Sequence, residues 1–139
     1  MTCKSLLLAA PVTLIVSACV APQDTAMPEP GEGAALYQQN CAVCHGADGK
    51  GGADLAGPAN SPADLTLLAQ GNGGVFPRAA VLSTIDGYNR MALGDQRMPE
   101  FGGFLEGGTV PMDVGDGRMT PVPRPLAALV TYLETLQAE

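Results

Sequence analysis

The stretch Cys41-Ala42-Val43-Cys44-His45 is the most informative motif in this 139-residue chain, and it decides which fold we expect. It has the pattern C-x-x-C-H, in which an imidazole directly follows the second of two thiols. Thiols at this spacing can each form a thioether with a vinyl group of haem, and the histidine can then bind the iron. The stretch therefore predicts one covalently attached haem c, held by Cys41 and Cys44, with His45 as a ligand of its iron.

A cysteine pair can also belong to a zinc site or to a redox-active dithiol. A structural zinc site needs four ligands, but His45 is the only histidine, and the other two cysteines, Cys3 and Cys19, belong to the N-terminal segment. A thioredoxin-like dithiol needs a βαβ context, which the residues around the motif do not indicate. Covalent haem is the interpretation that the sequence favours.

The composition suggests that the folded domain has a small protein core and long loops. With no Trp, three Phe and three Tyr, a core made of protein alone is thin for this length, and a buried porphyrin supplies the missing apolar mass. The 18 glycines and 12 prolines predict long loops.

Removal of Lys4 with the leader leaves 14 acidic against six basic residues, a net charge near −8. This charge argues against nucleic acid, which requires a basic surface.

The N-terminal segment predicts export. Residues 1–18 contain Lys4, then an apolar run from Leu6 to Val16 and then small residues, which is typical of a secretory signal peptide. The apolar run is too short to span a bilayer as a helix. We therefore expect an exported protein in the periplasm.

The sequence Val16-Ser17-Ala18-Cys19 resembles a bacterial lipobox, in which the cysteine is lipidated. Ordinary cleavage after Ala18 is the alternative, but it would leave Cys19 as a free exported thiol. Three prolines make residues 19–30 a semi-extended tether, and residues 31–139 form the predicted folded domain. We expect lipidated Cys19 to hold this domain at a membrane.

Apolar periodicity and capping residues predict three main helices and a shorter one. The first main helix runs from Gly31 to Cys44 and includes the two thiols. The middle helix begins at Pro77 and ends near Gly87, and the last runs from Pro125 to Gln137. A short helix over Leu65–Ala69 is expected to be capped by Asp64.

Together, the motif and its flanking helices resemble class I cytochrome c. In that family a glycine and an aromatic residue four positions apart precede the motif and cross a C-terminal helix. Gly33 and Tyr37 match, and Leu129 and Tyr132 fit the opposite helix. The resemblance implies an all-α cytochrome c fold, with three main helices and long loops around one haem. It also implies a proline carbonyl that accepts the Nδ1–H of the iron-bound histidine, for which Pro58 fits.

The resemblance further implies a methionine on the other side of the iron. Arg97-Met98-Pro99-Glu100-Phe101 is similar to the Met-Pro-x-Phe ligand loop of the family, so Met98 is the favoured ligand. Residues 102–124, however, form a predicted inserted loop that separates Met98 from the last helix. Met119 is therefore the main rival, with Met112 behind it. No second histidine exists in the chain, so two histidine ligands from one chain are excluded.

The function implied by the resemblance is that of a monohaem electron carrier, which exchanges single electrons with redox partner proteins of the cell envelope and is not an enzyme. Two alternatives are a haem subunit of a larger oxidase or dehydrogenase, and a gas or redox sensor if the methionine is labile. A third alternative, a dihaem peroxidase, would need a second haem motif, which this chain lacks. The fourth is a structural lipoprotein whose cysteine pair never receives haem. Arg90 and Arg97 either contact haem propionates or are solvated surface charges. The sequence does not indicate an oligomeric state.

Overall fold

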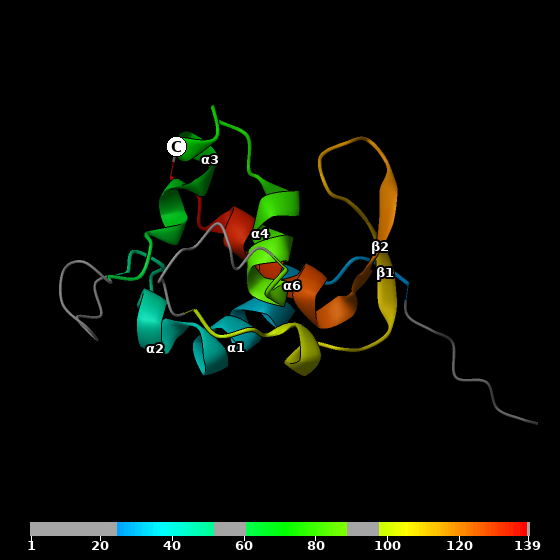
Figure 1. Ribbon diagram of the computed structural model, residues 1–139, viewed down its shortest axis with the longest axis horizontal. Helices are drawn as coiled ribbons and strands as arrows, with labels where there is room; N and C mark the ends of the chain where they lie inside the picture. Colours follow the sequence, from blue (N-terminus) through cyan, green and yellow to red (C-terminus); the bar gives the residue numbers. More distant parts are fainter. Residues whose placement is uncertain (1–24, 52–60, 89–97, 139) are drawn as a thin grey trace, which may run out of the picture.

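The computed structural model describes residues 25–51, 61–88 and 98–138 (Figure 1). Predictions about the leader, Cys19, Pro58, Arg90 and Arg97 therefore lie outside the described residues. In the part of the chain that is described, no helix is both long and apolar enough to cross a membrane. The elements, in chain order, are α1 (Pro30–Asn40), α2 (Ala42–His45), η2 (Leu65–Leu67), α3 (Leu68–Gly71), α4 (Arg78–Asp86), η3 (Gly102–Phe104), β1 (Thr109–Asp113), β2 (Met119–Pro123) and α6 (Arg124–Thr135).

The first and last helices cross at the centre of the fold. They meet at Gly33, where a Cβ would overlap the carbonyl oxygen of Ala128 and would lie 2.6 Å from the Cβ of Tyr132. One turn further along α1, the rings of Tyr37 and Tyr132 pack with their centroids 5.3 Å apart. The predicted close approach of the two helices at Gly33 is therefore confirmed. The buried core around this crossing consists of Tyr37, Val81, Ile85, Leu105, Val110, Met112, Val122, Leu126, Ala127, Leu129, Val130 and Leu133.

The predicted first helix is divided into two pieces. Proline at its first position and a capping box between Glu29 and Glu32 begin α1. α1 ends at Asn40, and Cys41 separates it from the four-residue helix α2. The boundary therefore falls within the C-x-x-C-H motif and not beyond it.

The middle helix matches its predicted bounds within one residue. Pro77 precedes the first helical residue of α4, and Gly87 ends the helix in a left-handed conformation, with φ of 98°. Val81 and Ile85 are buried, whereas Leu82 is half-buried. α4 thus contributes both to the core and to a partly exposed apolar surface.

A β-hairpin occupies the segment 102–124 that the sequence predicts to be an inserted loop. β1 and β2 pair antiparallel, and Val110, Met112 and Val122 face inward into the core. The turn uses glycine at positive φ, as at Gly115 with φ of 109°. The prediction of an all-α fold with three main helices therefore needs correction, because the described residues also contain a two-stranded sheet and further short helices.

Prolines protect the edges of this hairpin. The N–H of Arg124 donates to the carbonyl of Gly108 at 2.8 Å, which extends the ladder of β1 and β2 by one pair. Hydrogen-bonded pairs alternate with pairs that are not hydrogen-bonded. Pro111, Pro121 and Pro123 therefore fall at positions where the nitrogens point to the outer edges. Because proline has no N–H, these edges are poor templates for a further strand.

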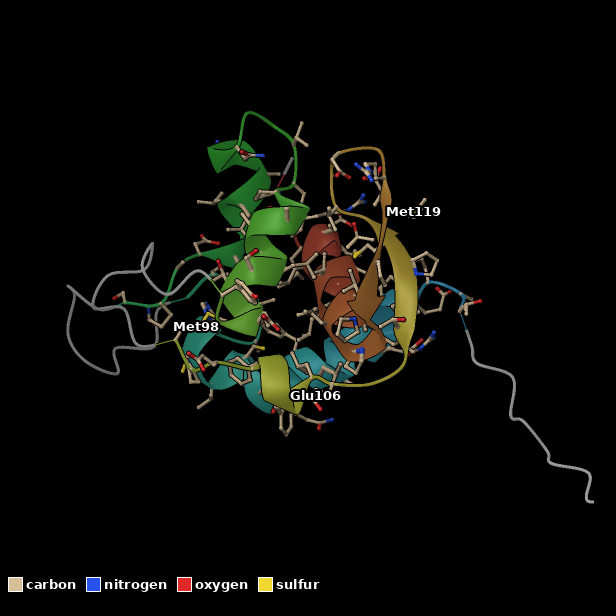
Figure 2. All side chains as sticks on the ribbon, turned by 45° about the vertical axis from the view of Figure 1, so that its right-hand side comes forward. Met98, Glu106 and Met119 are labelled. Carbon is tan, nitrogen blue, oxygen red and sulfur yellow. The ribbon has the colours of Figure 1, made fainter. Side chains whose placement is uncertain are left out.

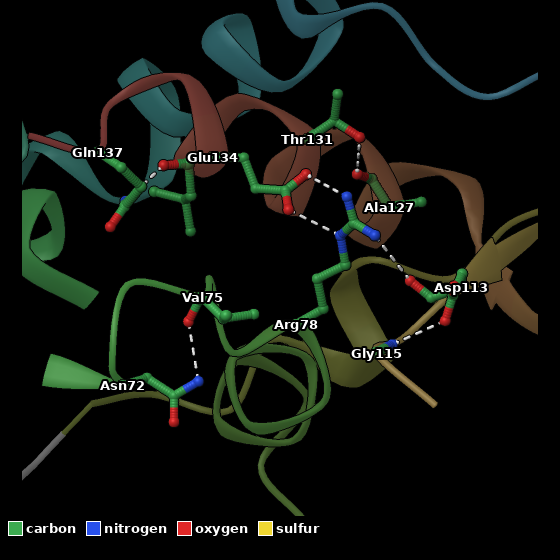
Figure 3. Close-up of polar contacts among 10 residues, drawn as sticks. Asn72, Val75, Arg78, Asp113, Gly115, Ala127, Thr131, Glu134 and Gln137 are labelled. Atoms are coloured by element: carbon green, nitrogen blue, oxygen red, sulfur yellow. Dashed lines mark hydrogen bonds and ion pairs between the residues drawn. The ribbon is translucent and has the colours of Figure 1, made fainter. Parts of the chain in front are cut away.

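Arg78 joins three elements of the fold (Figure 3). Its Nε lies 2.7 Å from Oε1 of Glu134 on α6, and its Nη2 lies 3.1 Å from Oε2 of the same carboxylate. Its Nη1 donates to the carbonyl of Asp113 on β1 at 3.2 Å. The ion pair with Glu134 raises the pKa of Arg78, so the guanidinium is always charged. One side chain of α4 thereby connects α6 to the hairpin.

Candidate functional site

α2 presents two thiols and an imidazole on one short turn. The N–H groups of Cys44 and His45 both donate to the carbonyl of Cys41, at 3.1 and 2.9 Å. Cys41 and Cys44 are free thiols and half-buried, while Val43 between them is 70% exposed. The thiols therefore lie at the boundary between core and solvent, where a large group can reach both sulfurs.

The imidazole of His45 is oriented by a backbone carbonyl. Its Nδ1 lies 3.0 Å from the carbonyl oxygen of Ala63. A carbonyl can only accept, so Nδ1 carries the proton in this hydrogen bond and Nε2 keeps a free lone pair. The sequence assigns this role to Pro58, which lies outside the described residues. Among the described residues the carbonyl that accepts from His45 belongs to Ala63, and the role of Pro58 stays a prediction.

A glycine-rich loop after the motif positions the segment that carries this carbonyl. The N–H of Gly51 donates to the carbonyl of His45 at 2.8 Å, and the N–H of Leu65 donates to the carbonyl of Gly49 at 2.7 Å. Gly51 has φ of 74°, and a Cβ there would overlap the carbonyl oxygen of Pro62. Glycine at this position therefore allows the two segments to approach closely.

Asp64 caps the helical turn that follows, as the sequence predicts. Its carboxylate accepts from the backbone N–H of Thr66 at 2.9 Å and from the Thr66 hydroxyl at 2.6 Å. These hydrogen bonds hold the pKa of Asp64 below its usual value, since they favour the charged form. The predicted helix over 65–69 forms as a 3₁₀ turn, η2, followed by α3. This cap fixes the chain directly after the carbonyl of Ala63.

Tyr37 connects the helix crossing to the motif loop. Its hydroxyl donates to the carbonyl of Gly46 at 2.7 Å, and its side chain is fully buried. Burial raises the pKa of Tyr37 to about 12, with smaller contributions from Cys41, Tyr132 and Asp48. The phenol therefore stays neutral and holds the residue after His45 in place.

The cysteine pair has properties that disfavour a dithiol or a zinc site. Burial, and to a lesser extent the neighbouring Cys44, raises the pKa of Cys41 to about 11. A thiol with such a pKa is a poor nucleophile at neutral pH. Among the residues that the structure describes, no group of three or more His, Cys, Asp or Glu side chains is placed to hold a metal ion. The first observation disfavours a reactive dithiol, and the second shows that the described residues do not form a zinc site around the pair.

The three candidate methionines lie in different environments. Met98 is half-buried and packs against the core, and Figure 2 shows it beside α2. The N–H of Phe101 donates to the carbonyl of Ile85 at 3.0 Å, which fixes the segment after Met98 against the end of α4. Met119 is 71% exposed on the hairpin, away from α2 (Figure 2), and Met112 is buried in the core. Only Met98 combines partial burial with a position next to the motif.

The residues around α2 fit a covalently bound haem. Two thiols are free, the lone pair of the imidazole Nε2 is available, and Met98 lies nearby. An apolar macrocycle also needs an apolar lining, because contact with such side chains removes its surface from water. Apolar side chains that pack against the core and remain partly buried could supply such a lining, and they include Leu65, Leu68, Phe76, Leu82, Met98 and Phe101.

Sequence reasoning missed two contributors, Ala63 and Arg78. Ala63 acts through its backbone carbonyl, which every residue type has, so the sequence contains no signal for it. Arg78 leaves a weak signal, because it lies in the first turn of a predicted helix, where a positive charge is unfavourable without a partner. That signal could have suggested an ion pair, although not with which residue.

Comparison with known proteins gives one match. A family model described as cytochrome c oxidase, cbb3-type, subunit III, matches residues 28–109, which is more than half of the chain. The match includes α1, α2 and Met98 and ends where β1 begins, so the rest of the hairpin and α6 lie beyond it. Searches of curated proteins and of solved structures gave no match.

Proposed function

The chain belongs to the family described as cytochrome c oxidase, cbb3-type, subunit III, and from this premise we propose that it is a monohaem electron carrier of the cell envelope. As a member of a family of c-type cytochrome domains, it carries covalently bound haem c with its iron. This cofactor supplies one-electron exchange between ferric and ferrous iron. In our proposal, Cys41 and Cys44 form the thioethers, and His45 and Met98 bind the iron.

The hydrogen bond from His45 to Ala63 is the observation that carries this proposal. It keeps the proton on Nδ1 and leaves Nε2 free for a metal. It also fixes the ring plane and makes the imidazole a stronger electron donor. A surface histidine without a role would not need its ring held by a carbonyl 18 residues further along the chain.

Met98 is the proposed ligand on the other face of the iron. Its thioether is a soft ligand that raises the reduction potential of haem iron. Its partial burial and its position beside α2 support this role over the exposed Met119 and the buried Met112. If His45 and Met98 both held the iron, no position would be open for a substrate, so we propose electron transfer without enzymatic activity.

Attachment to a larger respiratory complex is the second candidate function. It is favoured by the name of the matching family, which describes a subunit of an oxidase. In that case the chain would still carry electrons, but for one permanent partner. Mild detergent extraction followed by affinity purification separates the two candidates, because a permanent subunit would be recovered with stoichiometric partner chains and a carrier without them.

Export and lipidation complete the proposal for the cellular context. Residues 1–18 have the pattern of a signal peptide, and Cys19 is the proposed site of lipidation.

With 14 acidic and only seven basic residues, the chain should dock to a basic redox partner at a rate that falls as salt concentration rises. A transfer rate that is independent of salt would indicate an apolar contact surface instead.

The test of the carrier proposal is a visible spectrum of the purified haem protein. The oxidised and reduced forms should both be low-spin, and carbon monoxide added to the reduced form should leave the spectrum unchanged. Ready binding of carbon monoxide would show an open iron position, which contradicts the carrier proposal and favours a gas sensor.

A further inference from the structure

The described chain begins at the base of the β-hairpin. Nη1 of Arg124 donates to the carbonyl of Ala26 at 2.8 Å, and the same guanidinium pairs with Glu32 of α1 through contacts of 2.8 and 3.1 Å. The N–H of Arg124 donates to the carbonyl of Gly108, just before β1. These contacts hold residues 26–32 next to the hairpin, and Figure 1 shows the chain entering the domain past β1 and β2.

This entry point lies on the side of the molecule away from the motif. Figure 1 shows α2 and α3 on the left and the hairpin on the right, with α4 and α6 between them. Figure 2, turned by 45°, keeps Met98 and Met119 on opposite sides. The chain thus enters at one end of the domain, whereas the motif and the proposed iron ligand lie at the other.

Few residues separate this entry point from the proposed lipid anchor. Only six positions lead from Cys19 to Thr25, and six fully extended residues span about 20 Å. If Cys19 is lipidated, which is part of the proposed function, Thr25 at the base of the hairpin must stay within this distance of the lipid surface.

The outer surface of the hairpin presents exposed apolar side chains beside Thr109 and one carboxylate, Asp113, which lies opposite Met119 in the ladder. Pro111, Pro121 and Met119 are exposed on it, and Pro111 lies directly opposite Pro121 in the ladder. The prolines make the strand edges poor templates for a further strand. The carboxylate of Asp113 is occupied by the N–H groups of Gly115 and Gly117. The face of the hairpin, and not its edges, is therefore the surface available for contact.

We propose that the outer face of the hairpin, formed by Pro111, Met119 and Pro121, rests on the membrane that holds the lipidated N-terminus. The apolar face loses contact with water against the lipid boundary. Because residues 109–123 carry charged side chains of both signs, Asp113, Asp116 and Arg118, the contact is expected to depend little on salt. The motif end of the domain, with Val43 exposed, is consequently turned away from the membrane and toward redox partners.

The orientation can be measured with a fluorophore at two positions of the full lipidated haem protein. Met119→Cys places the probe on the hairpin, and Gln70→Cys, an exposed position of α3, places a matched probe at the far end. Thioether formation removes Cys41 and Cys44 from the labelling reaction. The proteins are then incorporated into phosphatidylcholine vesicles that contain a lipid with a nitroxide quencher on its headgroup.

We expect the probe at position 119 to be quenched several-fold more strongly than the probe at position 70, with a ratio that 0.5 M salt leaves largely unchanged. Equal quenching, or stronger quenching at position 70, would overturn the proposed orientation. A probe at position 119 that is quenched only at low salt would also overturn it, because the contact would then be electrostatic.

A flotation control separates this inference from the proposed function. The wild-type protein should float with the vesicles, and Cys19→Ala should not. If the wild type does not float, both the lipid anchor and the orientation are wrong, whereas an unchanged low-spin spectrum would leave the carrier function standing. If it floats but the quenching ratio is absent, the anchor stands and only the orientation fails.

Discussion

The two ends of the domain are stabilised in different ways. The hairpin end, formed by β1, β2 and Arg124, uses contacts within the chain: an inward apolar face, an ion pair to α1 and a turn capped by Asp113. The motif end, formed by α2, residues 46–51 and η2, has a backbone that is equally well hydrogen-bonded. Its side chains, however, include two free thiols, an imidazole with a free Nε2, and apolar groups that remain partly exposed.

This difference shows what each end needs from outside the chain. The hairpin end satisfies its own polar groups, so it can form from protein alone. The motif end fixes the backbone, and within the described ranges its two thiols are not joined in a disulfide and Nε2 of His45 makes no hydrogen bond. A cofactor that binds covalently would complete that end, which agrees with the haem c of the family. The contrast leads to five predictions, of which the first has the largest effect.

Removal of both thiols should abolish covalent haem attachment. In the double variant Cys41→Ser, Cys44→Ser no sulfur remains to form a thioether, so we expect a complete loss of haem staining on a denaturing gel. Cys19→Ala is the matched control, because it removes a cysteine outside the motif and should retain full staining. Haem that survives denaturation in the double variant would show that another residue holds it.

Replacement of the proposed iron ligand should open the site. Met98→Ala is expected to convert the reduced protein to a form that binds carbon monoxide, and to lower the reduction potential by on the order of 0.1 V, within the ~0.8 V range that axial ligands set. Met119→Ala should change neither property, since its side chain is exposed on the hairpin. The opposite result would transfer the ligand role to the hairpin end and remove the contrast between the two ends.

The helix crossing supports both ends and should be intolerant of any side chain at Gly33. Gly33→Ala places a Cβ against the carbonyl of Ala128, and we expect a loss of about 3 kcal/mol in unfolding free energy. Gly31→Ala is the matched control in the same helix, because no described atom lies within 4 Å of its new Cβ. It should be neutral or stabilising by up to ~1 kcal/mol. Denaturant unfolding followed by circular dichroism measures both values.

The Arg78 contacts should matter less, because the side chains of the pair remain partly exposed, at 36% for Arg78 and 26% for Glu134. We expect Arg78→Met to lower the unfolding free energy by about 1 kcal/mol and to leave the haem spectrum unchanged. A double-mutant cycle with Glu134→Gln isolates the ion pair from the hydrogen bond to Asp113. A change in the spectrum would mean that the two ends are coupled, contrary to the comparison above.

The smallest effect concerns acid sensitivity of the hairpin turn. Backbone N–H groups of Gly115 and Gly117 hold the pKa of Asp113 below its usual value. A carboxylate with a lowered folded pKa stabilises the fold above its unfolded pKa of about 4, and this contribution is lost as pH falls through the folded pKa. We therefore expect Asp113→Ala to lower the melting temperature at pH 6 and to have less effect near pH 2. If the melting temperature fell equally at both pH values, the loss of stability would not come from the charge of the Asp113 carboxylate.

The sequence predicted the cap by Asp64 and the bounds of α4 well because their signals are local. The C-x-x-C-H pattern, the cap by Asp64 and the helix bounds at Pro77 and Gly87 depend on residue types a few positions apart, and the structure contains the cap and these bounds. The crossing at Gly33 also followed from the resemblance. The carbonyl of Ala63 could not be predicted, because it acts through the backbone after a loop whose path the sequence does not specify.

The hairpin end was missed because its signals conflict. Prolines at 111, 121 and 123 and glycines at 115 and 117 indicate a loop, and they outweighed the inward alternation of Val110 and Met112. The prolines are compatible with strands here because only one hairpin forms, so every proline nitrogen can point to an edge. Such an arrangement can be recognised only once the pairing register is known.

The crossing of α1 and α6 also has a consequence for the order of events during biogenesis. Gly33 meets Ala128, 95 residues further along the chain, so this contact cannot form until those residues have been synthesised. At roughly 5 to 20 residues per second, the delay is about 5 to 20 seconds. Until α6 is available, α1 and the motif that follows it lack the helix against which α1 packs. The core of the domain therefore forms late, well after the motif itself has been made.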